Sequence, residues 1–155
     1  MEKLRQYLAS KLIAAFGVAV LIGIVLSYLH DIVQLALIPL GEWARITFIV
    51  NTSNEFVATN LVNFFFQIAT FSIAYAFALA LMGMLIPIKT MRYPSIAFST
   101  YLLINLWWIP LSFVVDFPPA FKIVLPLVPT LVFASVLVFW VLTKVVVRRY
   151  GTAHV

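Results

Sequence analysis

Cysteine is absent from this chain of 155 residues. Without a thiol, the chain cannot form disulfides, hold a thiolate zinc or iron–sulfur site, or use a cysteine nucleophile. Histidine is scarce as well, with His30 at the end of an apolar stretch and His154 beside the C-terminus. Two histidines so placed do not supply a pair of axial ligands for a haem inside a membrane. We therefore expect no metal site and no cofactor.

Charged residues are also few. They make up 10% of the chain, whereas hydrophobic residues make up 65%. About a quarter of a soluble domain is charged, and so few charges could not cover this much apolar surface in water. The length is that of one domain. The composition therefore predicts a single domain, residues 1–155, that is integral to a membrane.

Motifs for catalysis are missing too. No serine lies in a nucleophile elbow, and no glycine-rich loop could cradle a phosphate. A coupled carrier usually places a carboxylate inside the membrane, but every acidic residue here lies at the end of an apolar stretch or between two of them: Glu2, Asp31, Glu42, Glu55 and Asp116. We interpret the pair His30 and Asp31 as an interfacial cap rather than part of a metal site. We predict no catalytic residues and no enzyme activity.

Four apolar stretches are long enough to cross a membrane as helices, which takes about 20 residues each. They cover residues 12–29, 61–88, 95–115 and 123–143, and a basic tail follows at 144–155. The segment 32–50 is apolar at both ends but is interrupted by Pro39, Gly41, Glu42 and Arg45. We predict an all-α bundle of four transmembrane helices, in which residues 32–50 form an interfacial helix pair or a re-entrant hairpin that turns at Pro39 to Gly41.

The basic residues predict the orientation of these helices. With four spans, eight of them fall on one side of the membrane, namely Lys3, Arg5, Lys11, Lys89, Arg92, Lys144, Arg148 and Arg149. Only Arg45 and Lys122 fall on the other side. Basic loops stay in the cytoplasm, so both termini are expected there, in the plasma (inner) membrane.

The net charge of +5 is explained by these loops and tails, so we expect no nucleic-acid partner. Membrane lipids are the first partners to expect. Anionic lipid headgroups attract basic residues that lie beside a membrane. We predict such contacts for Lys89, Arg92, Lys144, Arg148 and Arg149.

Small residues indicate where helices pack. Ala15, Ala19, Gly23 and Ser27 follow one another at intervals of four, which aligns them on one face of the first helix. Such stripes let helix backbones approach closely in lipid. The second helix carries a polar face on one side and small residues such as Ala69, Ala76 and Ala80 on the other, so we expect both sides to be buried.

Polar residues on the second and third helices form the candidate site. Asn63 and Gln67 share a face of the second helix, and Asn105, Ser112 and Asp116 share a face of the third. We expect the two faces to pack together in the outer half of the membrane, with hydrogen bonds from Asn63 and Gln67 across to Asn105, to Ser112 or to the backbone carbonyls freed near Pro110. The cluster has two interpretations: structural bonds between helices, which we favour, or a polar site or pathway.

The function that these features favour is that of a non-catalytic membrane subunit, which packs against partner subunits of a larger complex and stabilises or positions them. Small-residue stripes, minimal loops and the lack of self-contained chemistry point that way. The alternative is a small homo-oligomeric channel or carrier for a small solute, built on the polar cluster. A weaker third possibility is a membrane enzyme or lipid-handling protein with a pocket between its helices.

Overall fold

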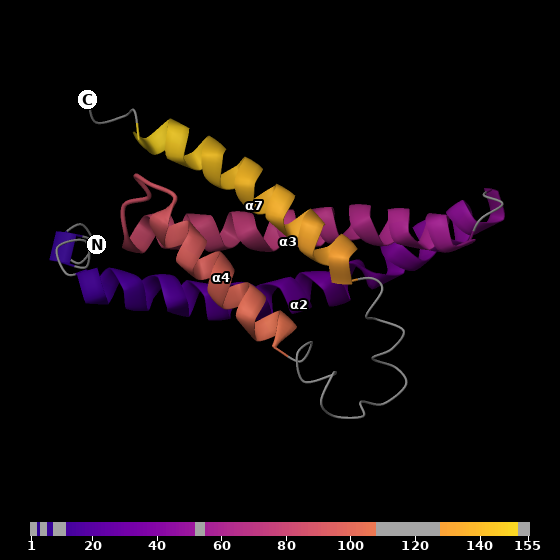
Figure 1. Ribbon diagram of the computed structural model, residues 1–155, viewed down its shortest axis with the longest axis horizontal. Helices are drawn as coiled ribbons and strands as arrows, with labels where there is room; N and C mark the ends of the chain where they lie inside the picture. Colours follow the sequence, from indigo (N-terminus) through magenta and orange to yellow (C-terminus); the bar gives the residue numbers. More distant parts are fainter. Residues whose placement is uncertain (1–2, 4–5, 8–11, 52–54, 108–127, 152–155) are drawn as a thin grey trace.

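The computed structural model describes residues 3, 6–7, 12–51, 55–107 and 128–151. Within these residues, four long α-helices carry the fold (Figure 1): α2 (Leu12–Asn51), α3 (Glu55–Leu85), α4 (Arg92–Leu106) and α7 (Val128–Gly151). The all-helical prediction is therefore confirmed for the part of the chain that is described.

Three of these helices are long and apolar enough to cross a membrane. The qualifying segments are Leu12–Thr47, Thr59–Leu85 and Val128–Arg149. They agree with the prediction of an integral membrane protein. The fourth, α4, has 15 residues, and the second half of the predicted span at 95–115 lies outside the described residues.

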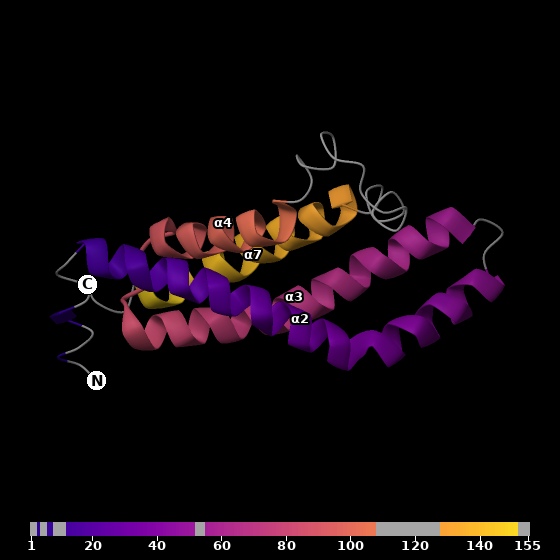
Figure 2. The same ribbon diagram turned by 90° about the horizontal axis from the view of Figure 1, so that it is seen from below.

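The predicted break between residues 30 and 50 is wrong. Helix α2 continues for 40 residues from Leu12 to Asn51, with Pro39 inside it, so neither a helix pair nor a re-entrant turn forms there. A proline lacks the N–H of one helical hydrogen bond and usually kinks a helix rather than ending it when neighbouring contacts hold both sides. Figure 2 shows α2 changing direction in its second half.

Two contacts keep α2 helical beyond the proline. Gly41 lies against the ring of Phe66 on α3, where an added Cβ would come within 3.0 Å of Cε2. Glu42 and Arg45, whose charges suggested an interruption, lie one turn apart and pair with each other at 3.0 Å. The charges therefore partly neutralise each other along the helix.

The helices form a bundle with a projecting hairpin. Helices α2 and α3 run antiparallel, α4 packs along α2, and α7 packs along α3 (Figures 1 and 2). The start of α2, the connection between α3 and α4, and the end of α7 lie at the same end of the bundle. At the opposite end, α2 and α3 extend past α4 and α7.

Aromatic rings fill the centre of the bundle. Phe71 of α3 lies 4.9 Å from Tyr101 of α4, measured between ring centroids. The rings of Phe98 on α4 and Phe139 on α7 stack at 4.4 Å. These contacts tie α4 to the α3 and α7 side of the bundle. Around them, small side chains such as Ala74 and Ala97 are fully buried and bring the helices close.

Two helix ends differ from the sequence prediction. Helix α3 begins at Glu55 rather than at residue 61, and it ends at Leu85, two residues before Pro87. Helix α7 continues to Gly151, so the basic residues predicted to form a tail lie on its last turns. Apolarity marks where lipid would surround a helix, and a helix continues past that limit wherever its backbone bonds and packing allow.

Candidate functional site

His30 is the centre of the most polar site in the bundle. It lies in the middle of α2, only 6% exposed, and not at a helix end. The interpretation of His30 as an interfacial cap is therefore wrong. Its ring packs edge-on against Tyr101 and Phe71, at 5.6 and 6.1 Å between centroids. The site thus has an aromatic wall on the side of α3 and α4.

The imidazole of His30 bonds to α3 and faces a hydroxyl of α4. The amide nitrogen of Gln67 lies 2.9 Å from Nε2, and the hydroxyl of Tyr101 lies 3.4 Å from Nδ1. An amide nitrogen only donates, so Nε2 is the acceptor in this arrangement. Nδ1 faces Tyr101, and an oxygen of Asp31 lies 3.9 Å from the same nitrogen.

Asn105 joins the same network from α4. Its amide nitrogen donates to the hydroxyl of Ser27 at 3.0 Å and to the carbonyl of Tyr101 at 2.8 Å. Ser27 lies one turn before His30 on α2, so a single face of α2 bonds to both neighbouring helices. Among the described residues, no buried side-chain nitrogen or oxygen lacks a partner.

A cavity of about 190 Å³ adjoins this network and opens on one side. All four helices contribute to its wall. The polar lining residues are His30, Asp31, Gln34, Gln67, Tyr101, Asn105 and Ser135, and the apolar ones are Leu102, Leu106, Val128, Leu131 and Val132. An apolar cavity of about 150 Å³ is known to hold one benzene molecule, so this space suits a ligand of about one six-membered ring.

The predicted polar cluster is only partly brought together. Gln67 and Asn105 both line the cavity, whereas Asn63 lies one turn before Gln67 on α3 and is half-buried. Ser112 and Asp116 lie outside the described residues. Gln67 lies within hydrogen-bond distance of His30, and Asn105 donates to Ser27, so both side chains also bond to α2. The reason is that α2 presents Ser27 and His30 between them.

The sequence contained a signal for the residues that were missed. Ser27, His30 and Gln34 are spaced by three and four, which places them on one face of a continuous helix. Ending the first helix at residue 29 separated His30 and Gln34 from that face. Tyr101 falls one turn before Asn105 and shares its face, but a tyrosine on an apolar helix is usually a packing residue.

The four small residues of α2 are all buried. Ala15, Ala19 and Ser27 are at most 6% exposed. A Cβ added to Gly23 would lie 2.5 Å from the carbonyl oxygen of Ala97 and 2.6 Å from Cβ of Thr100. The neighbour of this stripe is therefore α4 of the same chain.

The residues predicted to contact anionic lipid lie at one end of the bundle. Lys89 lies in the connection between α3 and α4, Arg92 is the first residue of α4, and Lys144, Arg148 and Arg149 lie on the last turns of α7. The ammonium of Lys144 lies 4.1 Å from the ring centroid of Trp140. This end of the bundle thus presents positive charge beside aromatic side chains.

The chemistry of the site is that of neutral hydrogen bonding. One imidazole, three amides and three hydroxyls surround the cavity or its network, with the carboxylate of Asp31 exposed at its edge. In the described parts of the chain, no three histidine, aspartate or glutamate side chains gather as a metal site needs. No protein-family model, curated protein or solved structure matches this chain, so no activity comes to it from a relative.

Proposed function

We propose that this chain is a non-catalytic subunit of a membrane complex, which packs against partner subunits and stabilises or positions them. The observation that carries the proposal is the hairpin extension, defined as α2 from Leu35 onward together with α3 up to Asn63; Val33, Gln34 and Phe64 beside it still contact the bundle. It projects past the ends of α4 and α7 (Figures 1 and 2).

The length of α2 explains why the extension needs a cover. From Leu12 to His30, the helix is about 27 Å long, which matches a hydrocarbon core of about 30 Å. The 21 residues from Asp31 to Asn51 add about 31 Å more. If the bundle crosses the membrane, the extension lies beyond the hydrocarbon core or bends along its surface.

The extension is apolar on its open side. Its exposed large side chains are Leu35, Ile38, Leu40, Trp43 and Ile46 on α2, and Val57 and Leu61 on α3. Burying one such side chain contributes about 1.5–3 kcal/mol, so six of them left in water would forgo on the order of 10 kcal/mol. Exposed apolar patches of this kind mark interaction surfaces. A partner subunit that covers them would recover this free energy.

The outer face of α3 also favours a partner. Ala69, Ala76 and Ala80 are exposed in the single chain, so this chain by itself does not bury the small-residue side of α3. Small residues on a lipid-facing helix are where a second helix packs most closely. A partner helix on this face would complete the burial that the sequence pattern indicated.

The proposed orientation has four crossings with both termini in the cytoplasm, in the plasma (inner) membrane. The basic residues at the shared end of α3, α4 and α7 support it, because basic segments stay in the cytoplasm. In that orientation, the hairpin extension lies on the outer side. Partners would then contact the chain at or above the outer leaflet.

Purification from the natural source in a mild detergent tests this proposal. We expect native mass measurement to show the chain with at least one other subunit. The variant L35A/I38A shortens two exposed side chains of the extension and should release that partner. The matched control L21A/V25A shortens exposed side chains of α2 within the bundle and should retain it. A lone monomer in the unchanged protein would contradict the proposal.

A second candidate function is favoured by the cavity beside His30: a homo-oligomeric channel or carrier for a small solute. Because neutral donors and acceptors dominate the lining, the solute would be uncharged and about the size of one ring. Liposomes that contain the purified chain should show solute flux, and Q67L/N105L should abolish it. Unchanged flux in that variant would rule out this route.

A further inference from the structure

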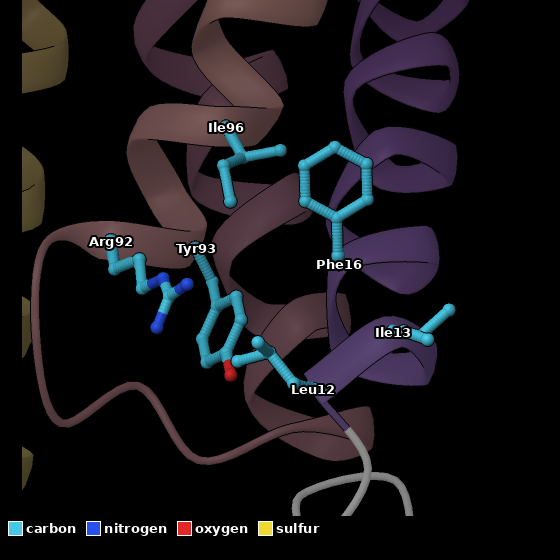
Figure 3. Close-up of a pocket in the computed structure, with 6 residues that line it drawn as sticks. All are labelled: Leu12, Ile13, Phe16, Arg92, Tyr93 and Ile96. Carbon is cyan, nitrogen blue, oxygen red and sulfur yellow. The ribbon is translucent and has the colours of Figure 1, made fainter.

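A second, smaller cavity lies at the opposite end of the bundle, between the first turns of α2 and α4. It holds about 170 Å³ and is open on one side. Its walls are Leu12, Ile13 and Phe16 of α2 and Tyr93 and Ile96 of α4, with Arg92 at the rim (Figure 3). It shares no residue with the polar site around His30.

The cavity is apolar inside and polar at one edge. In Figure 3, Phe16 and Ile96 lie side by side at the inner end, and Tyr93 directs its hydroxyl toward Leu12. The guanidinium of Arg92 lies beside the ring of Tyr93. An occupant that fits must therefore be apolar along most of its length and polar at one end.

Arg92 supplies a charge that can bind an anion. It is exposed, and within the described residues no carboxylate lies within 4 Å of it, since the ion pairs there involve only Glu42, Arg45, His30 and Asp31. A guanidinium binds phosphate oxygens with two parallel hydrogen bonds. The hydroxyl of Tyr93 is a second group of the rim that can donate.

The position of the cavity fits the boundary between headgroups and acyl chains. Leu12 is the first residue of the segment that is apolar enough to span a membrane. Lys89, Arg148 and Arg149 lie at the same end of the bundle, so the surroundings favour an anionic headgroup over one that carries a choline.

We propose that this groove, hereafter the Arg92 groove, binds one anionic phospholipid. The phosphate lies on the guanidinium of Arg92, and the start of one acyl chain packs against Phe16 and Ile96. The site is stoichiometric, in contrast to the diffuse attraction of lipid to a basic surface. It does not depend on the proposed subunit function, because the single chain supplies all six lining residues.

Native mass spectrometry of the purified chain in detergent tests the site, with phosphatidylglycerol, phosphatidylcholine and inorganic phosphate as probes. We expect one tightly bound phosphatidylglycerol per chain. R92Q should weaken it roughly tenfold, because a charge-assisted hydrogen bond to phosphate is lost. R92K should retain part of the affinity, and F16A should weaken binding by removing the acyl-chain wall.

Two matched controls separate the groove from its surroundings. R149Q removes an exposed arginine at the same end of the bundle, and F77A removes an exposed phenylalanine from α3. R149Q should weaken phosphatidylglycerol binding by less than R92Q does, because Arg149 does not line the groove and adds only to the general attraction, and F77A should leave the affinity unchanged. Equal losses in R92Q and R149Q would show diffuse attraction and overturn the proposal. Binding of phosphatidylcholine or inorganic phosphate as tight as that of phosphatidylglycerol would also overturn it, since the site would then not select an anionic lipid.

Discussion

At the scale of single residues, His30 and Gln67 show what a buried polar pair demands in a membrane helix. The imidazole and the amide are 6% and 4% exposed, and each bonds to the other. A polar group in an apolar interior costs free energy unless it is paired. The pair therefore specifies how α2 and α3 align along their axes, because only one alignment brings the two nitrogens within 2.9 Å.

Replacing one member of this pair tests its contribution. We expect Q67L to lower the free energy of unfolding by about 1–2 kcal/mol, because Nε2 of His30 loses its donor while it stays buried. The double variant H30L/Q67L should cost less than the sum of the single changes. The free energies of unfolding of the unchanged protein, both single variants and the double variant, measured in detergent micelles, give this double-mutant cycle. Additive costs would mean that the contact between the two nitrogens contributes nothing to stability.

At the scale of helices, the contact between α2 and α4 depends on a missing side chain. At Gly23 the two backbones approach so closely that a methyl group would overlap the carbonyl oxygen of Ala97. Backbone atoms cannot move aside as the end of a flexible side chain can. The close approach also brings Ser27 within reach of Asn105, one turn further along.

The two glycines of α2 within the bundle provide a matched pair of substitutions. G23A should destabilise the fold by about 1–3 kcal/mol, because it forces α2 and α4 apart. G17A meets nothing within 4 Å, so it should be neutral or stabilising by up to about 1 kcal/mol through helix propensity. Thermal unfolding of both variants in the same detergent gives the comparison. A stable G23A protein would mean that α2 and α4 do not touch there.

Helix α2 also shows that contacts along a helix can outweigh residues that by themselves predict its end. Proline and two charges argue for a break when each is taken alone. In the helix, Glu42 and Arg45 pair one turn apart, and Gly41, two residues after Pro39, packs on Phe66. The result is one helix that is about twice as long as the hydrocarbon core is thick.

At the scale of the whole molecule, the bundle and the hairpin extension divide the chain into two parts with different surroundings. The bundle has an aromatic and small-residue core and, at one end, the basic residues. The extension has an apolar surface and one ion pair, with little buried within it. Its stability therefore depends on what surrounds it, which is why we propose that a partner subunit covers it.

Because the chain has no cysteine, the proposed orientation in the membrane can be tested by introducing single cysteines. Single cysteines introduced as T90C, at the connection between α3 and α4, and L40C, on the extension, should react with an impermeant maleimide from opposite sides of the membrane. Cells of a host without the natural partner should label L40C from outside and T90C only after the membrane is opened. Labelling of both from one side would overturn the proposed orientation.

The sequence by itself determined that this is a helical membrane protein, because hydropathy and length are properties summed along the chain. It also singled out Gln67 and Asn105 as inward-facing, since the period of a helix assigns each residue to a face. Helical period does not reveal which neighbour that face meets, nor whether a helix continues through a proline. Only the tertiary structure decided that Gln67 and Asn105 both bond to α2, and that His30 lies buried between them, because those outcomes depend on contacts between residues distant in the sequence.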